Sequence, residues 1–437
     1  MQIAFLTLFL GLIAGPHTVA LSAASGVASI ELFLDGAGVA RLTGPPWTGR
    51  VDLGREPLPH HLVARARDAQ GGEVAEAEQW LNLPRPPAEV AILVEKALAG
   101  QPRTVRVAWQ SLTHARPTSI ALTLDGQPLA LDTRNRATLP PRPPDGATRV
   151  LSAELSFPDG LTARQDVALG RDYGDEVSTQ LTAVPVWWRG AGELPATAAM
   201  QGWFTDGGRP LQVDAVEAGL AQVWVVRDPA VARSVGRMGW HFWDRFMSAR
   251  ARLTLGHRAE LRFLSSTGRS FPGEGVDSEL FDSSPGYPIA GEYETASLLA
   301  RLSNRSERVG APQKLADAVA VAGLNACGTG RPRAVLLVVA HGAKDVSRFD
   351  AAAVRRYLAA LHVPLLVWSA DTPDPALKAA WGTVDDFTVI DGLDRGFRAL
   401  ARDLETQRIV WVEGRHLPQS IALAPAAPPD VRLDPAP

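Results

Sequence analysis

The chain has 437 residues, which is too long for a single hydrophobic core and predicts two to four domains. With 46% hydrophobic and 21% charged residues, its composition is that of a folded globular protein and excludes a disordered or fibrous chain. The net charge of −3 favours neither nucleic acid nor an anionic membrane surface as a partner.

The N-terminal stretch MQIAFLTLFLGLIAG has the apolar length of a secretory signal and is too short to span a membrane. We therefore predict a signal peptide over residues 1–16 and an exported protein, periplasmic or extracellular, with no further membrane insertion. The sequence does not define the cleavage point, and no Lys or Arg precedes the apolar run. The alternative is a buried first strand.

An internal repeat follows. The segment IELFLDGAGVA from Ile30 aligns with IALTLDGQPLA from Ile120, and each reads as a strand, an Asp-Gly turn and a return strand. In both copies a second strand pair follows, LVARARDAQGGEVA in the first and LSAELSFPDGLTA in the second. Two copies in the same order predict two β modules in tandem, residues 17–85 and 86–172. Short strands with frequent turn signals are typical of immunoglobulin-like sandwiches.

A third β-rich segment, residues 173–218, is predicted to connect these modules to the rest of the chain. It carries the aromatic pairs Trp187–Trp188 and Trp203–Phe204. We expect one ring of each pair to fill a core and the other to cover a domain junction. The alternative is that these tryptophans form a platform for a carbohydrate.

From residue 219 to residue 415, strands alternate with helices. The run RAVLLVVA from Arg333 predicts a strand buried on both faces. The runs FTVI and RIVWV are read as further strands, and residues 265–292 as a long loop. A last helix is predicted from apolar residues at helical spacing: Leu393, Phe397, Leu400 and Leu404.

This alternation predicts the fold class. We expect a multidomain chain with N-terminal all-β modules and a C-terminal α/β domain, whose doubly wound, mostly parallel sheet is Rossmann-like. The remaining residues, 416–437, are rich in Pro and Ala and are predicted to be a poorly ordered tail.

The first strand of the α/β domain ends in the segment VWVVRDPAVA, which places Asp228 at the rim of the sheet. With the order of parts, LADAV at Leu315 and RAVLLVVAHG at Arg333, the chain resembles secreted bacterial proteins with a von Willebrand factor A-related domain behind β modules. The resemblance implies a non-catalytic protein that binds other proteins outside the cytoplasm, in an adhesion-like or scaffolding role.

The same family carries a metal-ion-dependent adhesion site, built from Asp-x-Ser-x-Ser after the first strand, a Thr before a later helix and an Asp after the central strand. The corresponding positions in this chain are Asp228, Ala230, Ala232, Gln313 (or Pro312) and His341. Alanine has no ligand atom, and Mg²⁺ disfavours a histidine nitrogen. We therefore predict a degenerate site without a cofactor, whose residues form a metal-independent interaction surface.

Two alternatives to this reading stay open, both non-catalytic. The first is a metal-dependent adhesin whose substitute carboxylates bind Mg²⁺ or Ca²⁺; the candidates are Asp228, Glu274, Asp277, Asp282 and Asp345. The second is a carbohydrate-binding module. Since the sequence contains no G-x-S-x-G, H-E-x-x-H, P-loop or G-x-G-x-x-G motif, we predict no catalytic residues, and we expect a protein partner rather than nucleic acid.

Overall fold

The computed structural model describes the chain apart from residues 1–2, 8, 10, 24–25, 85–87, 96–103, 112–114, 125–126, 141–148, 159–161, 170–180, 191–193, 218–219, 250–258, 272–277, 285, 290–293, 304–311, 329, 343 and 435–437. The chain divides into two compact units. One comprises Met1–Pro84, Leu181–Ser270 and Glu279–Pro437, and the other comprises Arg85–Gln180 and Phe271–Ser278.

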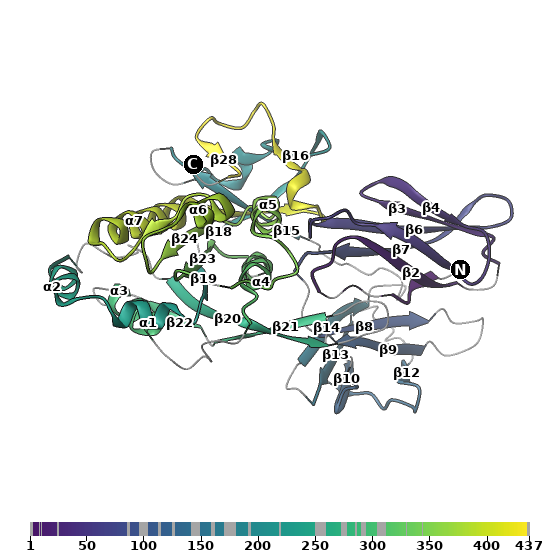
Figure 1. The fold of residues 1–437 in the computed structure, drawn as a ribbon. Coiled ribbons are helices and arrows are strands. Elements are labelled where there is room, and N and C mark those ends of the chain that lie inside the picture. The colour runs from purple at the N-terminus through teal and green to yellow at the C-terminus, as the bar shows by residue number, and fades with distance from the viewer. Residues whose placement is uncertain are drawn as a thin grey trace. The chain divides into compact units, whose positions relative to one another are not determined.

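The first β module is a sandwich of two antiparallel sheets (purple in Figure 1). One sheet has the order β1 (Ile3–Phe5), β2 (Pro16–Ala23), β5 (Thr48–Asp52). The other has the order β4 (Ala37–Leu42), β3 (Ser29–Leu34), β6 (His60–Arg67), β7 (Glu73–Leu81).

The second β module repeats this topology. One sheet has the order β12 (Arg136–Thr138), β9 (Thr104–Ser111), β8 (Ala88–Glu95). The other has the order β11 (Gln127–Pro128), β10 (Ser119–Leu124), β13 (Arg149–Ser156), β14 (Thr162–Leu169). A cluster of apolar residues from both sheets fills the core, among them Val105, Leu122 and Leu151.

The internal repeat is therefore confirmed as two sandwiches with the same strand order. In the first copy, Asp35 and Gly36 both have positive φ, 51° and 81°, as the tight turn between β3 and β4 requires. The second repeated segment forms the next hairpin in each module, β6–β7 and β13–β14.

The segment predicted to be a signal peptide is packed into the first module. Strand β1 pairs with β2, and Phe9, Leu12 and Ile13 are buried. Asn82 holds the backbone of Ile13 through two hydrogen bonds of 2.8 Å, one donated by the Ile13 N–H and one accepted by its carbonyl. The segment thus has the structure of the alternative, a buried first strand, because a secretory apolar run and a core strand have the same composition. Export stays a prediction.

The α/β domain has a mostly parallel sheet, as predicted. Its order is β21 (Ser278–Ser283), β20 (Ala259–Phe271), β19 (Ala221–Arg227), β23 (Arg333–Val339), β24 (Leu365–Ser369), β25 (Asp385–Asp386). Strands β20, β19, β23, β24 and β25 are parallel, while β22 (Tyr287–Ile289) pairs antiparallel with β20. Strands β19 and β23 are buried along their whole length, as expected for the centre of a covered sheet.

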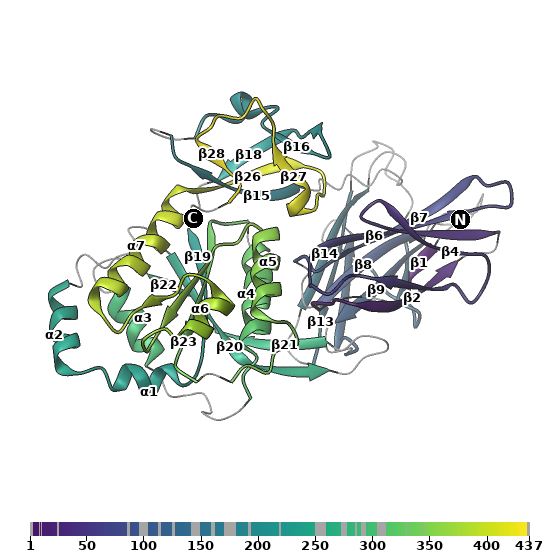
Figure 2. The ribbon, with the colours of Figure 1, turned by 45° about the horizontal axis from the view of Figure 1, so that its top comes forward.

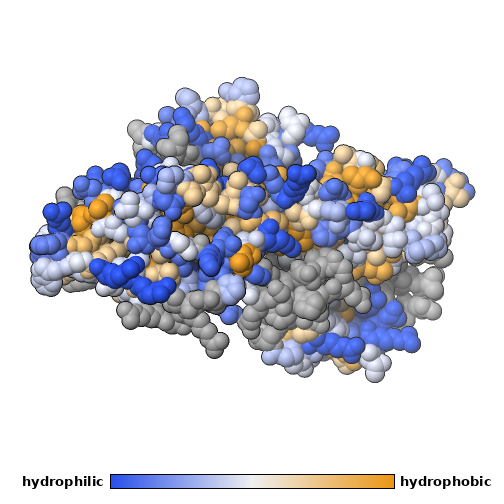
Figure 3. All heavy atoms as spheres, viewed as in Figure 1, coloured by the Kyte–Doolittle hydropathy of each residue, from blue (hydrophilic) through white to orange (hydrophobic). Residues whose placement is uncertain are grey.

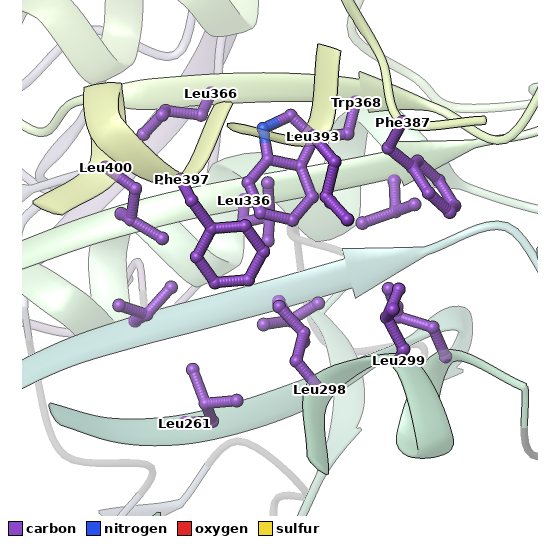
Figure 4. Packing of buried hydrophobic residues seen from close by; sticks show 14 of the residues in the cluster. Leu261, Leu298, Leu299, Leu336, Leu366, Trp368, Phe387, Leu393, Phe397 and Leu400 are labelled. Carbon is purple, nitrogen blue, oxygen red and sulfur yellow. The ribbon is translucent and has the colours of Figure 1, made fainter. Parts of the chain in front are cut away.

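Helices cover both faces of this sheet (Figure 2). Their bounds are α1 (Val231–Gly236), α2 (Trp240–Ala249), α3 (Glu294–Leu302), α4 (Leu315–Cys327), α5 (Ala351–Ala360), α6 (Pro375–Trp381) and α7 (Ile390–Thr406). Helices α1, α2, α3 and α7 share one core cluster, and α4, α5 and α6 share the other. Figure 4 shows Leu393, Phe397 and Leu400 of α7 facing the sheet, so the predicted apolar face of this helix is confirmed.

One predicted strand of this domain is absent, and another joins a different sheet. The run FTVI is not a strand: β25 ends at Asp386, and Asp386 Oδ1 accepts the backbone N–H of Thr388, which turns the chain into α7. The run RIVWV is a strand, β26 (Gln407–Glu413), but it does not join the parallel sheet. The segment predicted to be a long loop contains strands, because β20 continues to Phe271 and β21 and β22 follow.

Strand β26 instead organises a small β domain with the predicted connector and the predicted tail. One sheet has the order β18 (Val213–Glu217), β26, β15 (Leu181–Trp188), β28 (Val431–Arg432). The other has the order β17 (Arg209–Pro210), β16 (Phe204–Asp206), β27 (Ile421–Leu423), and the 3-10 helices Thr197–Met200 and Pro418–Ser420 complete it. The tail prediction is wrong because Ile421 and Val431 are buried in this core. Pro and Ala are compatible with short edge strands as well as with disorder.

The first module docks on the α/β domain within the same unit. Leu12, Trp80 and Leu83 of the module belong to the core cluster beneath α4 and α5. The buried hydroxyl of Tyr357, on α5, donates to the carbonyl oxygen of Asn82 at 2.8 Å. This module is therefore fixed to the α/β domain by apolar packing as well as by the chain.

The surface shown in Figure 3 is mixed, with small apolar areas separated by hydrophilic residues. Across the described residues, no helix is both long enough and apolar enough to cross a membrane.

Candidate binding crevice at the sheet edge

The strand order of the α/β domain creates a crevice at one position. The chain leaves β19 for β20 on one side and later places β23 on the other, so the winding direction reverses between β19 and β23. In doubly wound folds, ligands bind outside the carboxyl ends of the strands at such a point. A pocket of about 970 Å³ lies there. It is lined by Ala230, Ala232, Arg233, Ser234, Gly236, Arg237, Ala340, His341, Asp371 and Thr372.

Asp228 stabilises the turn from β19 into α1. Its backbone N–H donates to Val338 O on β23, and its Oδ1 accepts the N–H of Ala230, both at 2.9 Å. The side chain is buried, and Oδ2 has no hydrogen-bond partner among the described residues. Burial raises the pKa of this carboxyl, against the lowering effect of the Ala230 and Ala340 N–H groups and of Arg233. The observed role is a turn cap.

The two positions that would be serines in a metal site are part of the crevice wall. Ala230 and Ala232 both line the pocket and contribute only methyl groups. Ala232 is buried, so its side chain faces the protein rather than the solvent. These residues shape the crevice but coordinate nothing.

His341 reaches the crevice at the end of β23, but its ring points outward. The side chain is 73% exposed, and Nδ1 lies 3.7 Å from Asp374 Oδ2. Its backbone N–H donates to Asp371 Oδ2 at 2.9 Å. The contribution of His341 to the inner crevice is therefore a backbone donor that is already engaged.

Asp371 is the polar centre of the crevice, and the sequence analysis missed it. Its Oδ2 accepts the Ser234 hydroxyl at 3.0 Å, and Arg237 Nη2 donates to Ser234 Oγ at 3.2 Å. Arg237 also lies 4.0 Å from Asp371 Oδ1. Asp371 follows the apolar run VPLLVWSA as Asp228 follows β19, and that repeated pattern is the signal that could have revealed it.

Gln313 does not line the crevice. It is buried, its Oε1 accepts the hydroxyl of Ser266, and its backbone forms an isolated β-bridge with that of Asp345. Asp345 in turn accepts the N–H groups of Leu315 and Ala316 at 3.0 and 3.1 Å. Asp345 therefore caps the start of α4, while Gln313 links the segment before α4 to Ser266 on β20.

A metal ion does not fit the donor set that the structure brings together. Two of the five positions predicted for a metal site are alanines, Oδ1 of Asp228 accepts the Ala230 N–H, and Asp345 caps a helix. Asp282 lies exposed on β21, while Glu274 and Asp277 fall outside the described residues. Within the described part of the chain, no group of three acidic, His or Cys side chains could hold a metal.

The proposed aromatic platform is not exposed. Trp187 and Trp203 are buried, and Trp188 packs on the core of the small β domain. One ring of each pair is buried, as expected, but Phe204 lies in the same core as Trp203 and does not cover a domain junction.

Comparisons with known proteins give no family. No protein-family model matches the chain, and no curated protein matches it. Among solved structures, the fibronectin(III)-like modules of Clostridium thermocellum CbhA match with 8% identity and a TM-score of 0.16, over 41% of this chain and 100% of that chain. The central fibronectin-III array of RIM-binding protein matches with 7% identity and a TM-score of 0.23, over 44% and 78%.

A third match is Bacteroides ovatus SGBP-B of a mixed-linkage glucan utilization locus, in complex with a mixed-linkage heptasaccharide. It has 12% identity and a TM-score of 0.14, over 48% of this chain and 57% of that chain. TM-scores this low assign no function, and the fold rests on the strand order described above.

Proposed function

We propose that this chain is an exported, non-catalytic interaction protein whose von Willebrand factor A-like domain recognises a protein partner without a metal ion. The family resemblance is supported by the doubly wound sheet and by Asp228, which follows the first strand at the switch point. The absence of metal-ligand chemistry at Ala230 and Ala232 supports recognition by shape and hydrogen bonds.

The observation that carries the proposal is an exposed apolar face on α2. This helix buries Phe242 and Phe246 in the core, yet Trp240 is 80% exposed and Met247 is 53% exposed. Together with the partly buried Trp243, they occupy positions i, i+3 and i+7, which lie on one side of a helix. We call Trp240, Trp243 and Met247 the α2 stripe.

The α2 stripe has the composition of a protein-binding hot spot. Tryptophan is enriched where binding energy concentrates, and methionine adapts to irregular partner surfaces. The ring of Trp243 packs edge-on against Phe242, with centroids 5.4 Å apart, so the helix that presents the stripe is anchored to the core. A rigid aromatic face loses little conformational entropy on binding.

The residues of the α2 stripe follow those of the crevice closely in the sequence. Arg233 and Ser234 of α1 line the crevice together with Arg237, which follows the helix, and only two residues separate Arg237 from Trp240. A partner could therefore place apolar side chains on α2 and polar groups in the crevice. Such an arrangement, an apolar centre beside polar groups, is typical of specific protein interfaces.

Site-specific photo-cross-linking tests this proposal. A benzophenone amino acid is placed at Trp240, and a matched variant carries it at Val39, an exposed apolar residue of the first module. Both proteins are expressed in the native host and irradiated, with and without a divalent-metal chelator.

We expect one discrete cross-linked protein species from position 240, unchanged by the chelator and absent from position 39. The same species from both positions would contradict binding through α2. Loss of the species with the chelator would contradict metal-independent recognition.

A further inference from the structure

Two histidines hold the C-terminal segment, residues 414–434 (yellow in Figure 2). The strands of this segment are short: β27 pairs with β16 over three residues, and β28 pairs with β15 over two. Each ladder therefore contributes few backbone hydrogen bonds, and side-chain contacts carry a larger share of the attachment than in a long strand.

His362 connects the C-terminal segment to the α/β domain. This residue follows α5, and its side chain is 10% exposed. Nδ1 lies 3.3 Å from Asp434 Oδ1, and Nε2 lies 3.1 Å from the carbonyl oxygen of Pro418. One ring thus contacts the segment near its start and at its end.

The backbone at His362 is of a kind that disfavours histidine. Its φ is 51°, in the left-handed region. Its N–H donates to Ala359 O, and the N–H of Val363 donates to Leu358 O, which is the pattern that usually ends a helix with Gly or Asn. The contacts of the ring therefore offset a backbone cost.

His416 fixes the start of the same segment in the same way. Its side chain is 16% exposed, and Nδ1 lies 2.6 Å from Asp206 Oδ2 on β16. Nε2 lies 2.9 Å from the carbonyl oxygen of Glu413. The backbone N–H of His416 donates to Thr182 Oγ1 at 3.0 Å, which holds the residue in place on β15.

All four atoms that the two rings contact are hydrogen-bond acceptors. A carboxylate or carbonyl oxygen cannot donate, so a ring nitrogen that bonds to one must carry a proton. Neutral imidazole has a single N–H and would turn a lone pair toward one of its two oxygens. Only the imidazolium form satisfies both contacts of each ring.

Asp434 is the acidic partner of His362. The hydrogen bond from His362 lowers the pKa of this carboxyl below its usual value of 3.8, against the raising effect of burial. Asp434 is therefore ionised throughout the range in which a histidine titrates.

The other charged groups near His362 do not replace Asp434. His362 and Asp434 line a concavity of about 620 Å³, whose other charged residues are Arg355 of α5, Asp385 of β25, and Arg395, Arg402 and Asp403 of α7. Arg395 lies 3.7 Å from Asp385 and Arg402 lies 3.9 Å from Asp403, which leaves the charge of Arg355 to oppose the imidazolium. Among the described residues, Asp434 alone forms an ion pair with His362.

Asp206 has the same position relative to His416. Glu413 and Arg415 lie near His416 in the chain, and Arg209 lies opposite Asp206 in the β16–β17 hairpin. The Arg415 guanidinium lies over the ring of Trp80 instead. In the part of the chain that the structure describes, the ion pair of His416 is the one with Asp206.

We propose that His362 and His416 form a pH-controlled latch, which fixes the C-terminal segment while both rings are protonated and releases it as they lose their protons. The bonds of the imidazolium stabilise the attached segment at low pH, and this stabilisation is lost as pH rises through the titration of histidine, at about pH 6.5 in an unperturbed side chain. Release leaves β15 and β16 each with a free edge, because β28 and β27 are the strands beside them. The latch goes beyond the proposed function and involves neither the crevice nor the α2 stripe.

NMR of the full chain with ¹⁵N-labelled histidine tests the protonation state directly. The signals of the two rings are assigned by their loss in His362→Asn and in His416→Asn. At pH 6 we expect both nitrogens of each ring to give imidazolium signals. A neutral tautomer in either ring at this pH would overturn the proposal.

Hydrogen exchange at pH 6 and pH 8, corrected for the intrinsic effect of pH, tests the release. Peptides from residues 417–434 should lose protection by about tenfold or more at pH 8, the change that corresponds to one pKa unit of coupling. Peptides from β23, at the centre of the sheet, should keep theirs. Equal protection of the segment at the two pH values would contradict release.

The double variant His362→Asn/His416→Asn tests which groups are responsible. Asparagine tolerates the left-handed backbone at position 362 and does not titrate, so protection of the segment should become the same at pH 6 and pH 8.

The matched control is His60→Asn. The His60 ring also contacts a carboxylate and a carbonyl, Asp35 Oδ2 at 2.7 Å and Leu53 O at 3.2 Å, but both lie in the first module. This variant should leave the response of the C-terminal segment unchanged. A response that persists in the double variant, or that is lost in His60→Asn, would overturn the latch.

Discussion

The Asp345 carboxylate accepts the backbone N–H of Leu315 at 3.0 Å. Asp345 therefore caps helix α4, and the oxygen that makes this bond is not available as a metal ligand. The residue before α4, Lys314, gives the helix no side-chain cap. Asp345 therefore supplies from a distant loop what a local N-cap residue would supply. In the opposite direction, Asp317 of α4 accepts the N–H groups of Arg348 and Phe349 in that loop.

Asp345→Ala should lower the free energy of unfolding by about 1–2 kcal/mol, the usual cost of losing a helix cap. Urea denaturation measures the effect. The matched control is Lys344→Ala, an exposed neighbour for which we expect no measurable change. If Asp345→Ala were as stable as the control, the capping role would be wrong.

Asp403 should make stability depend on pH. Burial raises its pKa to about 6 from a usual value of 3.8. Between these two values the folded state binds the proton more tightly than the unfolded state, so stability falls as pH rises from 4 to 6 and then levels off. The total loss is up to about 3 kcal/mol.

Asp403→Asn should remove this slope and raise stability above pH 6. Melting temperatures between pH 4 and pH 8 measure it, with Asp391→Asn on the exposed side of the same helix as control. A slope that persists in Asp403→Asn would assign the pH dependence to another group.

Tyr357 should couple the first β module to the α/β domain. Tyr357→Phe leaves the buried Asn82 carbonyl without its donor and should cost about 1–3 kcal/mol. Tyr357→Ala should cost about 3–5 kcal/mol, because it also leaves a cavity.

Hydrogen exchange locates this effect. In Tyr357→Ala, peptides of the first module should exchange faster while the small β domain stays protected. The control is Tyr287→Phe, on β22. Equal acceleration in both regions would show a general loss of stability rather than uncoupling.

Removal of residues 1–16 should destabilise the first module. Phe9, Leu12 and Ile13 are buried, and each buried apolar side chain contributes about 1.5–3 kcal/mol. Melting of the truncated chain beside the full chain measures the loss. An unchanged melting temperature, together with a mature N-terminus after residue 16 in the exported protein, would show that the segment is a dispensable signal.

Local patterns in the sequence were sufficient to predict most elements. The Asp35–Gly36 turn, the unbroken apolar run of β23 and the spaced apolar face of α7 each specify one local structure. The sequence does not predict which strands β26 pairs with, because its apolar run suits either the parallel sheet or the sheet of the small β domain. In the structure, β26 keeps partly exposed residues along its length, whereas every residue of β23 is buried.

The candidate site was predictable in part. Asp228 and His341 do reach the sheet edge, because each follows a strand that points there. Gln313 was misplaced within that edge, since the bonds of Ser266 and Asp345 to it depend on distant segments. The role of Asp371 depends on Ser234 and on the backbone of His341, neither of which is near it in the sequence.

The measurement that tests metal-independent recognition most directly is a thermal melt after chelation, with and without millimolar Mg²⁺, Mn²⁺ or Ca²⁺. An ion at a hundred times its dissociation constant would add about 2.7 kcal/mol and raise the melting temperature by a few degrees. We expect no shift with any ion, because Ala230 and Ala232 supply no ligand and Asp345 is engaged at α4. A rise of several degrees that Asp228→Ala abolishes would contradict the account and restore a metal site to the crevice.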